Sequence, residues 1–158
     1  MPHVLETGFE VIEGSNPNGS PRIRGYNIIN GQLTEAKDGG TFESHNPAWL
    51  DDCLGEFPLS GKDDVHAALH AARDAFSGWA ATPAPTRGQI IGNMGRLLME
   101  YKDDIVRVET REIGKTLKES AGEVQEAIDT CLFFQSEGRR LYGQTVNSEL
   151  PDKELFTY

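Results

Sequence analysis

The sequence is short of cysteine, basic residues and long apolar runs, and each shortage excludes a class of protein. Its 158 residues contain 15 Lys and Arg against 25 Asp and Glu, a net charge of −10. An acidic chain without a basic patch repels phosphates and anionic lipid, so we expect neither nucleic acid nor a membrane as a partner. No run approaches the roughly 20 apolar residues that span a bilayer. Residues 1–15 lack the apolar core of a secretory signal, which predicts a cytoplasmic location.

Only two cysteines are present, Cys53 and Cys131, and they lie far apart in the sequence. Their separation fits neither a metal knuckle nor a redox pair. Without an export signal, a disulfide is not expected, so the sequence predicts two reduced thiols.

Three glycine patterns resemble nucleotide-binding loops but lack essential features. Gly114-Lys115-Thr116 has Glu109 where the loop needs its first glycine. The segment 55–62 has one residue too many and is followed by Asp63 instead of Ser or Thr. The third set has the wrong spacing and follows no predicted strand: Gly88, Gly92 and Gly95. We therefore expect no phosphate-binding or cofactor-binding residues in this chain.

A histidine pair is the only candidate metal site that the sequence suggests. His66 and His70 are four residues apart in a predicted helix, so both imidazoles can face one ion. No Glu stands beside His66 in the metalloprotease arrangement, and no third ligand is evident. The sequence favours two surface histidines, and a small metal-binding protein is kept as an alternative.

Four regions follow from composition and periodicity. Residues 1–21 read as a flexible arm, because they end in a run of turn-forming residues. Residues 22–59 contain short strands and a hairpin around Asn30-Gly31, a dipeptide typical of tight turns. Residues 60–143 form a helical layer, and residues 144–158 are extended near their end.

The helical layer is predicted from apolar residues at alternating steps of three and four. Ser60 and Asp63 suggest a capping box at the start of the first helix. Pro85 opens the second helix, the third ends near Gly114, and the fourth runs toward Leu141. The predicted apolar stripes are Val65–Leu69–Ala72–Phe76–Trp79, Ile90–Met94–Leu97–Tyr101 and Leu117–Ala121–Val124–Ile128–Cys131. Since the strand–helix alternation of a parallel sheet is missing, these helices are expected to cover a larger body.

From about residue 25 to the end, the chain resembles the N-terminal part of an aldehyde dehydrogenase. The resemblance rests on short motifs in a fixed order. They are Ile29-Asn30-Gly31, Asn46-Pro47-Ala48, Trp79 with Pro83 and Arg87, Glu112-Ile113-Gly114-Lys115, Gly122-Glu123-Val124, Phe133-Phe134 and Ser148-Glu149-Leu150-Pro151.

This resemblance implies an α/β fold of which the chain holds a hairpin, short strands and about four helices. It implies NAD- or NADP-dependent oxidation of a small aldehyde or semialdehyde through a cysteine thiohemiacetal, in a homodimer or homotetramer. The final strand would begin an oligomerisation ribbon. The family's nucleophilic cysteine and its glutamate have no counterpart here, and neither Cys53 nor Cys131 occupies the nucleophile's context. We therefore expect no catalytic, cofactor-binding or metal-binding residue, and no bound cofactor, in the 158 residues alone.

A second interpretation belongs to another class of protein. The predicted apolar stripes at Val65–Trp79 and Ile90–Tyr101 would also suit a non-catalytic helical module that binds a partner subunit. In both interpretations, these surfaces are covered by other polypeptide.

Overall fold

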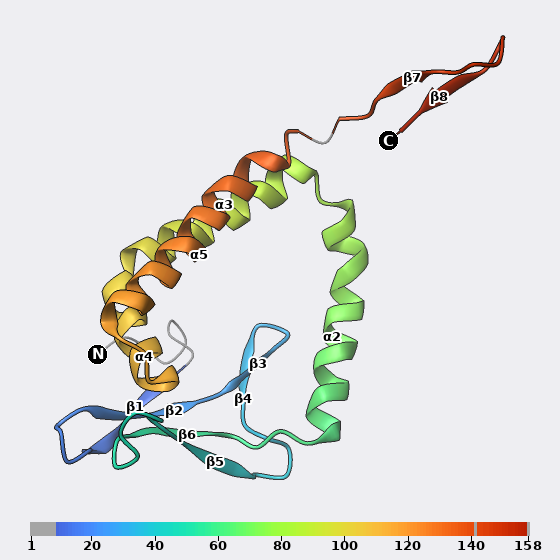
Figure 1. The fold of residues 1–158 in the computed structure, drawn as a ribbon. Coiled ribbons are helices and arrows are strands. Elements are labelled where there is room, and N and C mark those ends of the chain that lie inside the picture. Colours follow the sequence, from blue (N-terminus) through green and yellow to red (C-terminus); the bar gives the residue numbers. More distant parts are fainter. Residues whose placement is uncertain (1–8, 141, 158) are drawn as a thin grey trace.

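The computed structural model describes residues 9–140 and 142–157. A small sheet lies at one end, and helix α2 (Lys62–Ala81) leads from it to a pair of adjacent helices, α3 (Ala84–Glu100) and α5 (Leu117–Glu137) (Figure 1). Helix α4 (Lys102–Ile113) connects those two helices and returns to the sheet. This mixture of short strands and four helices confirms the predicted α/β class.

The main sheet has four strands in the order β1-β2-β6-β5. Strand β1 (Phe9–Ser15) is antiparallel to β2 (Pro21–Gly25), and β6 (Cys53–Pro58) is antiparallel to β5 (Thr41–His45). The two halves join through a parallel contact between β2 and β6. Gly55 makes this contact possible, because its φ is +153° and a side chain there would collide with the Ile23 backbone.

The prediction of a flexible arm at residues 1–21 is wrong for the part that the structure describes, residues 9–21. Strand β1 pairs with β2 over Phe9–Ile12 and again at Ser15, with an irregularity between them, and the buried Asn16 lies in the turn that follows. The side chain of Asn16 donates to the Cys53 carbonyl and accepts from the Cys53 N–H, both at 2.8 Å. The turn-rich composition correctly indicated a turn but could not show that its asparagine binds a strand 37 residues later.

The hairpin predicted at Asn30-Gly31 is confirmed. Strand β3 (Asn27–Ile29) pairs with β4 (Gln32–Thr34) in an antiparallel ladder. The turn residues have φ values of 51° and 73°, as a tight turn with two left-handed residues requires.

The four predicted helices are present, with corrections at two ends. Helix α2 starts at Gly61 rather than through a Ser60–Asp63 box, because the Asp64 carboxylate accepts from the Gly61 N–H at 2.8 Å. Ser60 instead hydrogen-bonds the Asn27 side chain. Helix α5 ends at Glu137, short of the predicted limit at Leu141, a residue outside the described part.

Helices α3 and α5 pack along a line of glycines. Gly88, Gly92 and Gly95 are buried, and each faces the later half of α5. A Cβ atom at Gly95 would lie 2.8 Å from the Cys131 Cβ, and one at Gly88 would collide with the Gln135 carbonyl. Glycine therefore lets the two backbones approach, which is the role these residues have in place of a nucleotide loop.

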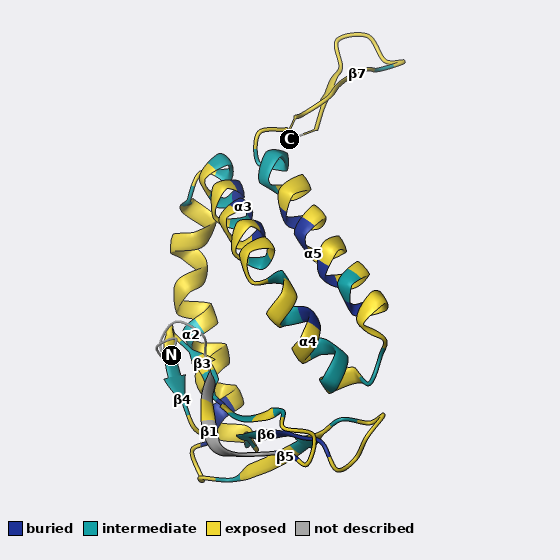
Figure 2. Ribbon diagram, turned by 90° about the vertical axis from the view of Figure 1, so that its left-hand side faces the viewer, coloured by how far each residue is buried: buried dark blue, intermediate teal, exposed yellow. Residues whose placement is uncertain are grey.

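The apolar core of the described residues is small. Val106, Val124 and Ile128 form its buried centre, with Leu98, Ile105 and Ala121 packed around it. The apolar stripes predicted on α2 and α3 face outward, so that α2 is exposed along most of its length (Figure 2). Phe76 is 70% exposed and Leu69 is 62% exposed. The helices thus present apolar faces that no described residue covers.

The last two strands form a hairpin that projects from the helical layer (Figure 1). Strand β7 (Thr145–Asn147) pairs antiparallel with β8 (Glu154–Phe156), and the side chains of both strands are exposed. This agrees with the extended end predicted from residue 154. Within residues 9–140 and 142–157, no helix is both long and apolar enough to cross a lipid bilayer.

Candidate functional site

A buried ion pair connects the sheet to helix α4. Asp52, whose side chain is 2% exposed, comes directly before β6, and Arg111 is in the last turn of α4. The Arg111 guanidinium donates from Nη2 to Asp52 Oδ1 at 2.9 Å and from Nε to Oδ2 at 3.1 Å. Ser20 and Asn46 donate further hydrogen bonds to the same carboxylate, at 2.7 and 3.2 Å.

These bonds determine the charge state of Asp52. The hydrogen bonds from Arg111 lower the pKa of the Asp52 carboxyl well below its usual range, against the opposing effect of burial. Ser20 and Asn46 lower this pKa further. Because both carboxylate oxygens are already bound by donors, Asp52 is suited to hold the sheet on the helix and not to transfer protons. Sequence reasoning did not identify this pair, since nothing local links two residues 59 positions apart.

A second charged group lies at the turn between α4 and α5. Gly114 ends α4 with φ 74°, and the Thr116 side chain caps α5 by accepting from the Glu119 N–H. Lys115 forms ion pairs with Glu123 and, at 3.6 Å, with Glu109. The Gly114-Lys115-Thr116 sequence therefore joins two helices, whereas a nucleotide loop would follow a strand.

The pKa values of the two glutamates at this junction are shifted in opposite directions. A hydrogen bond to Glu123, together with burial, raises the pKa of Glu109. The hydrogen bond from Lys115 lowers the pKa of Glu123. Both effects come from three charged side chains around the junction of α4 and α5, of which Glu109 and Lys115 are partly buried.

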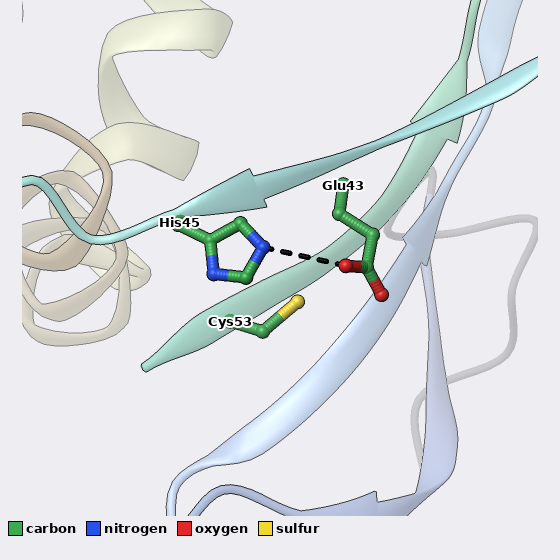
Figure 3. Close-up of side chains that lie close together, drawn as sticks. All are labelled: Glu43, His45 and Cys53. Atoms are coloured by element: carbon green, nitrogen blue, oxygen red, sulfur yellow. Dashed lines mark hydrogen bonds and ion pairs between the residues drawn. The ribbon is translucent and has the colours of Figure 1, made fainter. Parts of the chain in front are cut away.

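The third group contains Glu43, His45 and Cys53, at the contact between β5 and β6 (Figure 3). Glu43 and His45 are exposed, whereas Cys53 is only 7% exposed. The potential ligand atoms of the three side chains all lie within 4.8 Å of one another. Sequence reasoning missed this group, although its residue types are those of a transition-metal site, because the three are separated by the loop at 46–52.

The candidates that the sequence did suggest lie elsewhere. His66 and His70 are exposed on α2, beside Leu69 and Phe76. In the part of the chain that the structure describes, no group of three metal-ligating side chains includes either histidine. Cys131 is buried in α5 against Gly95, and it and Cys53 are both free thiols.

Comparison with known proteins decides the family. The model of the aldehyde dehydrogenase family matches residues 33–158, which is most of the chain. The chain belongs to the aldehyde dehydrogenase family. The resemblance predicted from residue 25 onward is thereby confirmed for the region that the family model covers.

Among characterised relatives of this aldehyde dehydrogenase chain is the NADP⁺ succinate-semialdehyde dehydrogenase of Escherichia coli. The two are 38% identical over 138 residues, which are 87% of this chain and 28% of the relative. The glutarate-semialdehyde dehydrogenase of Pseudomonas putida is 35% identical over 127 residues, 80% of this chain and 26% of the relative. The chain thus spans about a quarter of the length of the curated relatives that it matches.

Solved structures agree with this assignment. An NADP-dependent enzyme of E. coli superposes with a TM-score of 0.76 at 38% identity, over 84% of this chain and 27% of that one. An aldehyde dehydrogenase of Brucella melitensis biovar abortus gives a TM-score of 0.74 at 33% identity, over 82% and 26% of the two chains. Over the four fifths of the chain that superposes, the fold is therefore similar to the corresponding part of these two structures.

Proposed function

We propose that this chain is the N-terminal part of an NAD(P)⁺-dependent dehydrogenase subunit that oxidises a semialdehyde to a carboxylic acid. The observation that carries the proposal is the match to semialdehyde dehydrogenases over four fifths or more of this chain, but over only about a quarter of theirs. A stand-alone interaction module is not favoured, because the match runs through the strands as well as the helices.

The exposed apolar faces support the same proposal. Side chains of α2 and α3 that are spaced for burial are instead more than half exposed, among them Val65, Leu69, Phe76 and Leu97. Full burial of an exposed apolar side chain contributes about 1.5–3 kcal/mol, so covering the exposed half of one of these contributes about half of that. The remainder of a dehydrogenase subunit would provide this cover, and the projecting β7–β8 hairpin would begin the ribbon that joins subunits into a homodimer or homotetramer.

We propose that the described residues contribute scaffold to the dehydrogenase and not chemistry. In residues 9–140 and 142–157, two of the three glycine sets that resemble nucleotide loops pack α3 on α5 or join α4 to α5, and the third lies in β6 and at the start of α2. These residues do not fit the pyrophosphate of NAD or NADP, so we derive no reaction step through a cofactor here. The described part supplies the sheet, the helical layer and the Asp52–Arg111 junction that holds them together.

The substrate class follows from the relatives. Curated relatives are named for succinate, α-ketoglutarate and glutarate semialdehydes, each of which has a carboxylate opposite the aldehyde. We therefore propose a semialdehyde with an acidic end as the substrate. Residues outside this chain would then provide the group that binds this carboxylate.

Intact mass and turnover, measured side by side, test the proposal. The natural polypeptide is expected to have a mass several times that of these 158 residues, and to reduce NAD⁺ or NADP⁺ when given succinate semialdehyde. The purified 158-residue chain is expected to form no NADH or NADPH with any aldehyde. Turnover by the short chain itself, or a natural polypeptide without aldehyde-dependent reduction, would contradict the proposal.

A further inference from the structure

A bulge in β6 brings a cysteine onto the same face as a histidine and a glutamate. In β5, Glu43 and His45 are two residues apart, so both side chains point to one face of the sheet. Glu43 pairs with Glu56, but His45 pairs with Cys53 and not with Leu54, which would be its partner in a regular ladder. The extra residue in β6 therefore moves Cys53 directly opposite His45.

The imidazole of His45 is held in the orientation of a metal ligand. Its Nδ1 lies 2.9 Å from the Leu50 carbonyl oxygen, which can only accept, so Nδ1 carries a hydrogen. This leaves Nε2 directed at Glu43 Oε2, 3.3 Å away (Figure 3). Metal-bound histidines usually donate their other N–H to a backbone carbonyl or a carboxylate, as His45 does.

The distance between these two atoms also suits a bound ion. In a tetrahedral zinc site with Zn–N and Zn–O bonds of about 2.0–2.1 Å, the nitrogen and oxygen lie about 3.3–3.4 Å apart. The Nε2–Oε2 separation already has this value. An ion would replace the proton that lies between the two atoms when His45 is charged.

Glu43 and Cys53 each place a ligand atom within 4.8 Å of the His45 ligand nitrogen. Arg22 donates from Nη2 to Glu43 Oε1 at 2.7 Å, which orients the carboxylate and leaves Oε2 facing His45. The Cys53 thiol can donate to the Gly55 carbonyl at 3.9 Å, and its sulfur also interacts with the Arg22 guanidinium. The Asn16 side chain holds the backbone of Cys53 on both sides of this residue. The cluster is thus held in place by its surroundings.

We propose that Glu43, His45 and Cys53 bind one Zn²⁺ ion, with water in the fourth position. Binding forms one Zn–O, one Zn–N and one Zn–S bond to the protein, while the hydrated ion loses all its waters but the one that remains as the fourth ligand. The thiol proton and any proton on Nε2 are released to solvent. A thiolate and an imidazole favour zinc over calcium or magnesium, which prefer oxygen ligands only. The ion would join β5 to β6 beside the Asp52–Arg111 pair, and the proposal does not depend on the proposed dehydrogenase function.

Cobalt is the probe, because Co²⁺ occupies zinc sites and reports its ligands by absorption. The purified 158-residue chain is treated with EDTA under reducing conditions, dialysed and titrated with Co²⁺. One cobalt per chain is expected, with a thiolate-to-cobalt charge-transfer band and the visible bands of tetrahedral Co²⁺. Excess Zn²⁺ should remove these bands and raise Tm, because an ion that binds only the folded state stabilises it.

Variants assign the ligands. Cys53→Ser should abolish the charge-transfer band, and His45→Gln should weaken Co²⁺ binding by roughly 100-fold or more. The matched controls, Cys131→Ser and His66→Gln, should leave stoichiometry and spectrum unchanged. If Cys53→Ser does not fold, as shown by circular dichroism, the exposed His45→Gln variant decides the result.

Three results would overturn the proposal. They are a wild-type chain that binds no cobalt, a bound ion without a thiolate band, and a signal that survives His45→Gln. Loss of binding in His66→Gln would instead place the ion at the histidine pair on α2. Because the readouts are metal content and absorption, failure here is distinct from failure of the dehydrogenase proposal.

Discussion

The Asp52–Arg111 pair makes a prediction about stability. Substituting Arg111→Met leaves a buried carboxylate without its cation, and breaking such a pair typically costs about 3–5 kcal/mol. We expect a loss near the lower end, because the Arg111 side chain is 21% exposed. Urea unfolding followed by circular dichroism measures it. The control Arg107→Met removes a guanidinium that is 72% exposed from the same helix, and it should change stability by less than about 0.5 kcal/mol.

The same carboxylate predicts a dependence on acid. Its pKa is lower in the folded state than the usual value of about 3.9, so the charged form stabilises the fold above that pH. This contribution is lost as the pH falls toward the folded-state pKa. The free energy of unfolding of the wild type should therefore decrease below about pH 4 more steeply than that of Asp52→Asn. The exposed Asp63→Asn variant should keep the wild-type slope, and equal slopes for all three would contradict the assignment.

The sequence alone could not show that Asp52 and Arg111 form a buried ion pair. Asp52 stands in a turn and Arg111 in an amphipathic helix, both ordinary places for charged residues. Their contact depends on where α4 returns to the sheet, which no local pattern records. The Glu43–His45–Cys53 group was missed for a related reason, because a one-residue bulge reverses the face on which Cys53 lies.

The glycine line between α3 and α5 predicts opposite effects for the same substitution. Gly95→Ala places a Cβ 2.8 Å from the Cys131 Cβ, and such overpacking typically costs about 1–3 kcal/mol. Gly122→Ala, on the open side of α5, meets no atom within 4 Å and should stabilise by about 0.5–1 kcal/mol through helix propensity. Thermal unfolding of both variants compares them. Two stabilised variants would show that the helices are not in close contact.

Helix positions were predicted well because their apolar residues recur at steps of three and four, and the Asn30-Gly31 turn was predicted because its conformation is local. The sequence did not predict which face of α3 is buried. Its apolar stripe, which includes Met94 and Leu97, points outward, while its glycines point toward α5. Periodicity shows that a helix has two faces, but it does not show which of them meets a neighbour within the same chain.

The exposed apolar faces predict the behaviour of the isolated chain. It should bind a hydrophobic dye and self-associate, because large apolar patches are rare on monomeric proteins. Phe76→Glu should reduce both effects without loss of helical circular dichroism. Ser77→Glu adds the same charge to the same helix beside the stripe and should reduce them less. A dye-silent monomer would contradict the view that these faces are built to be covered.

The expectation that the helices cover a larger body came from the sequence, and the small core of the described residues agrees with it. The sequence could not show where on the molecule the exposed apolar faces lie relative to one another. The stripes of α2 and α3 and the hairpin β7–β8 are exposed in different places, and no sequence pattern records this arrangement (Figures 1 and 2).

The position of β6 between β2 and β5 has a consequence for synthesis on the ribosome. Strands β1 and β2 leave the exit tunnel before β6, so the free edge of β2 finds its partner only after the chain has emerged through about Pro58. Until then, the β1–β2 hairpin is a two-stranded ribbon, which is marginally stable in water. A translational pause before that point would prolong the lifetime of an unpaired edge, and edges of this kind are where nascent chains begin to aggregate.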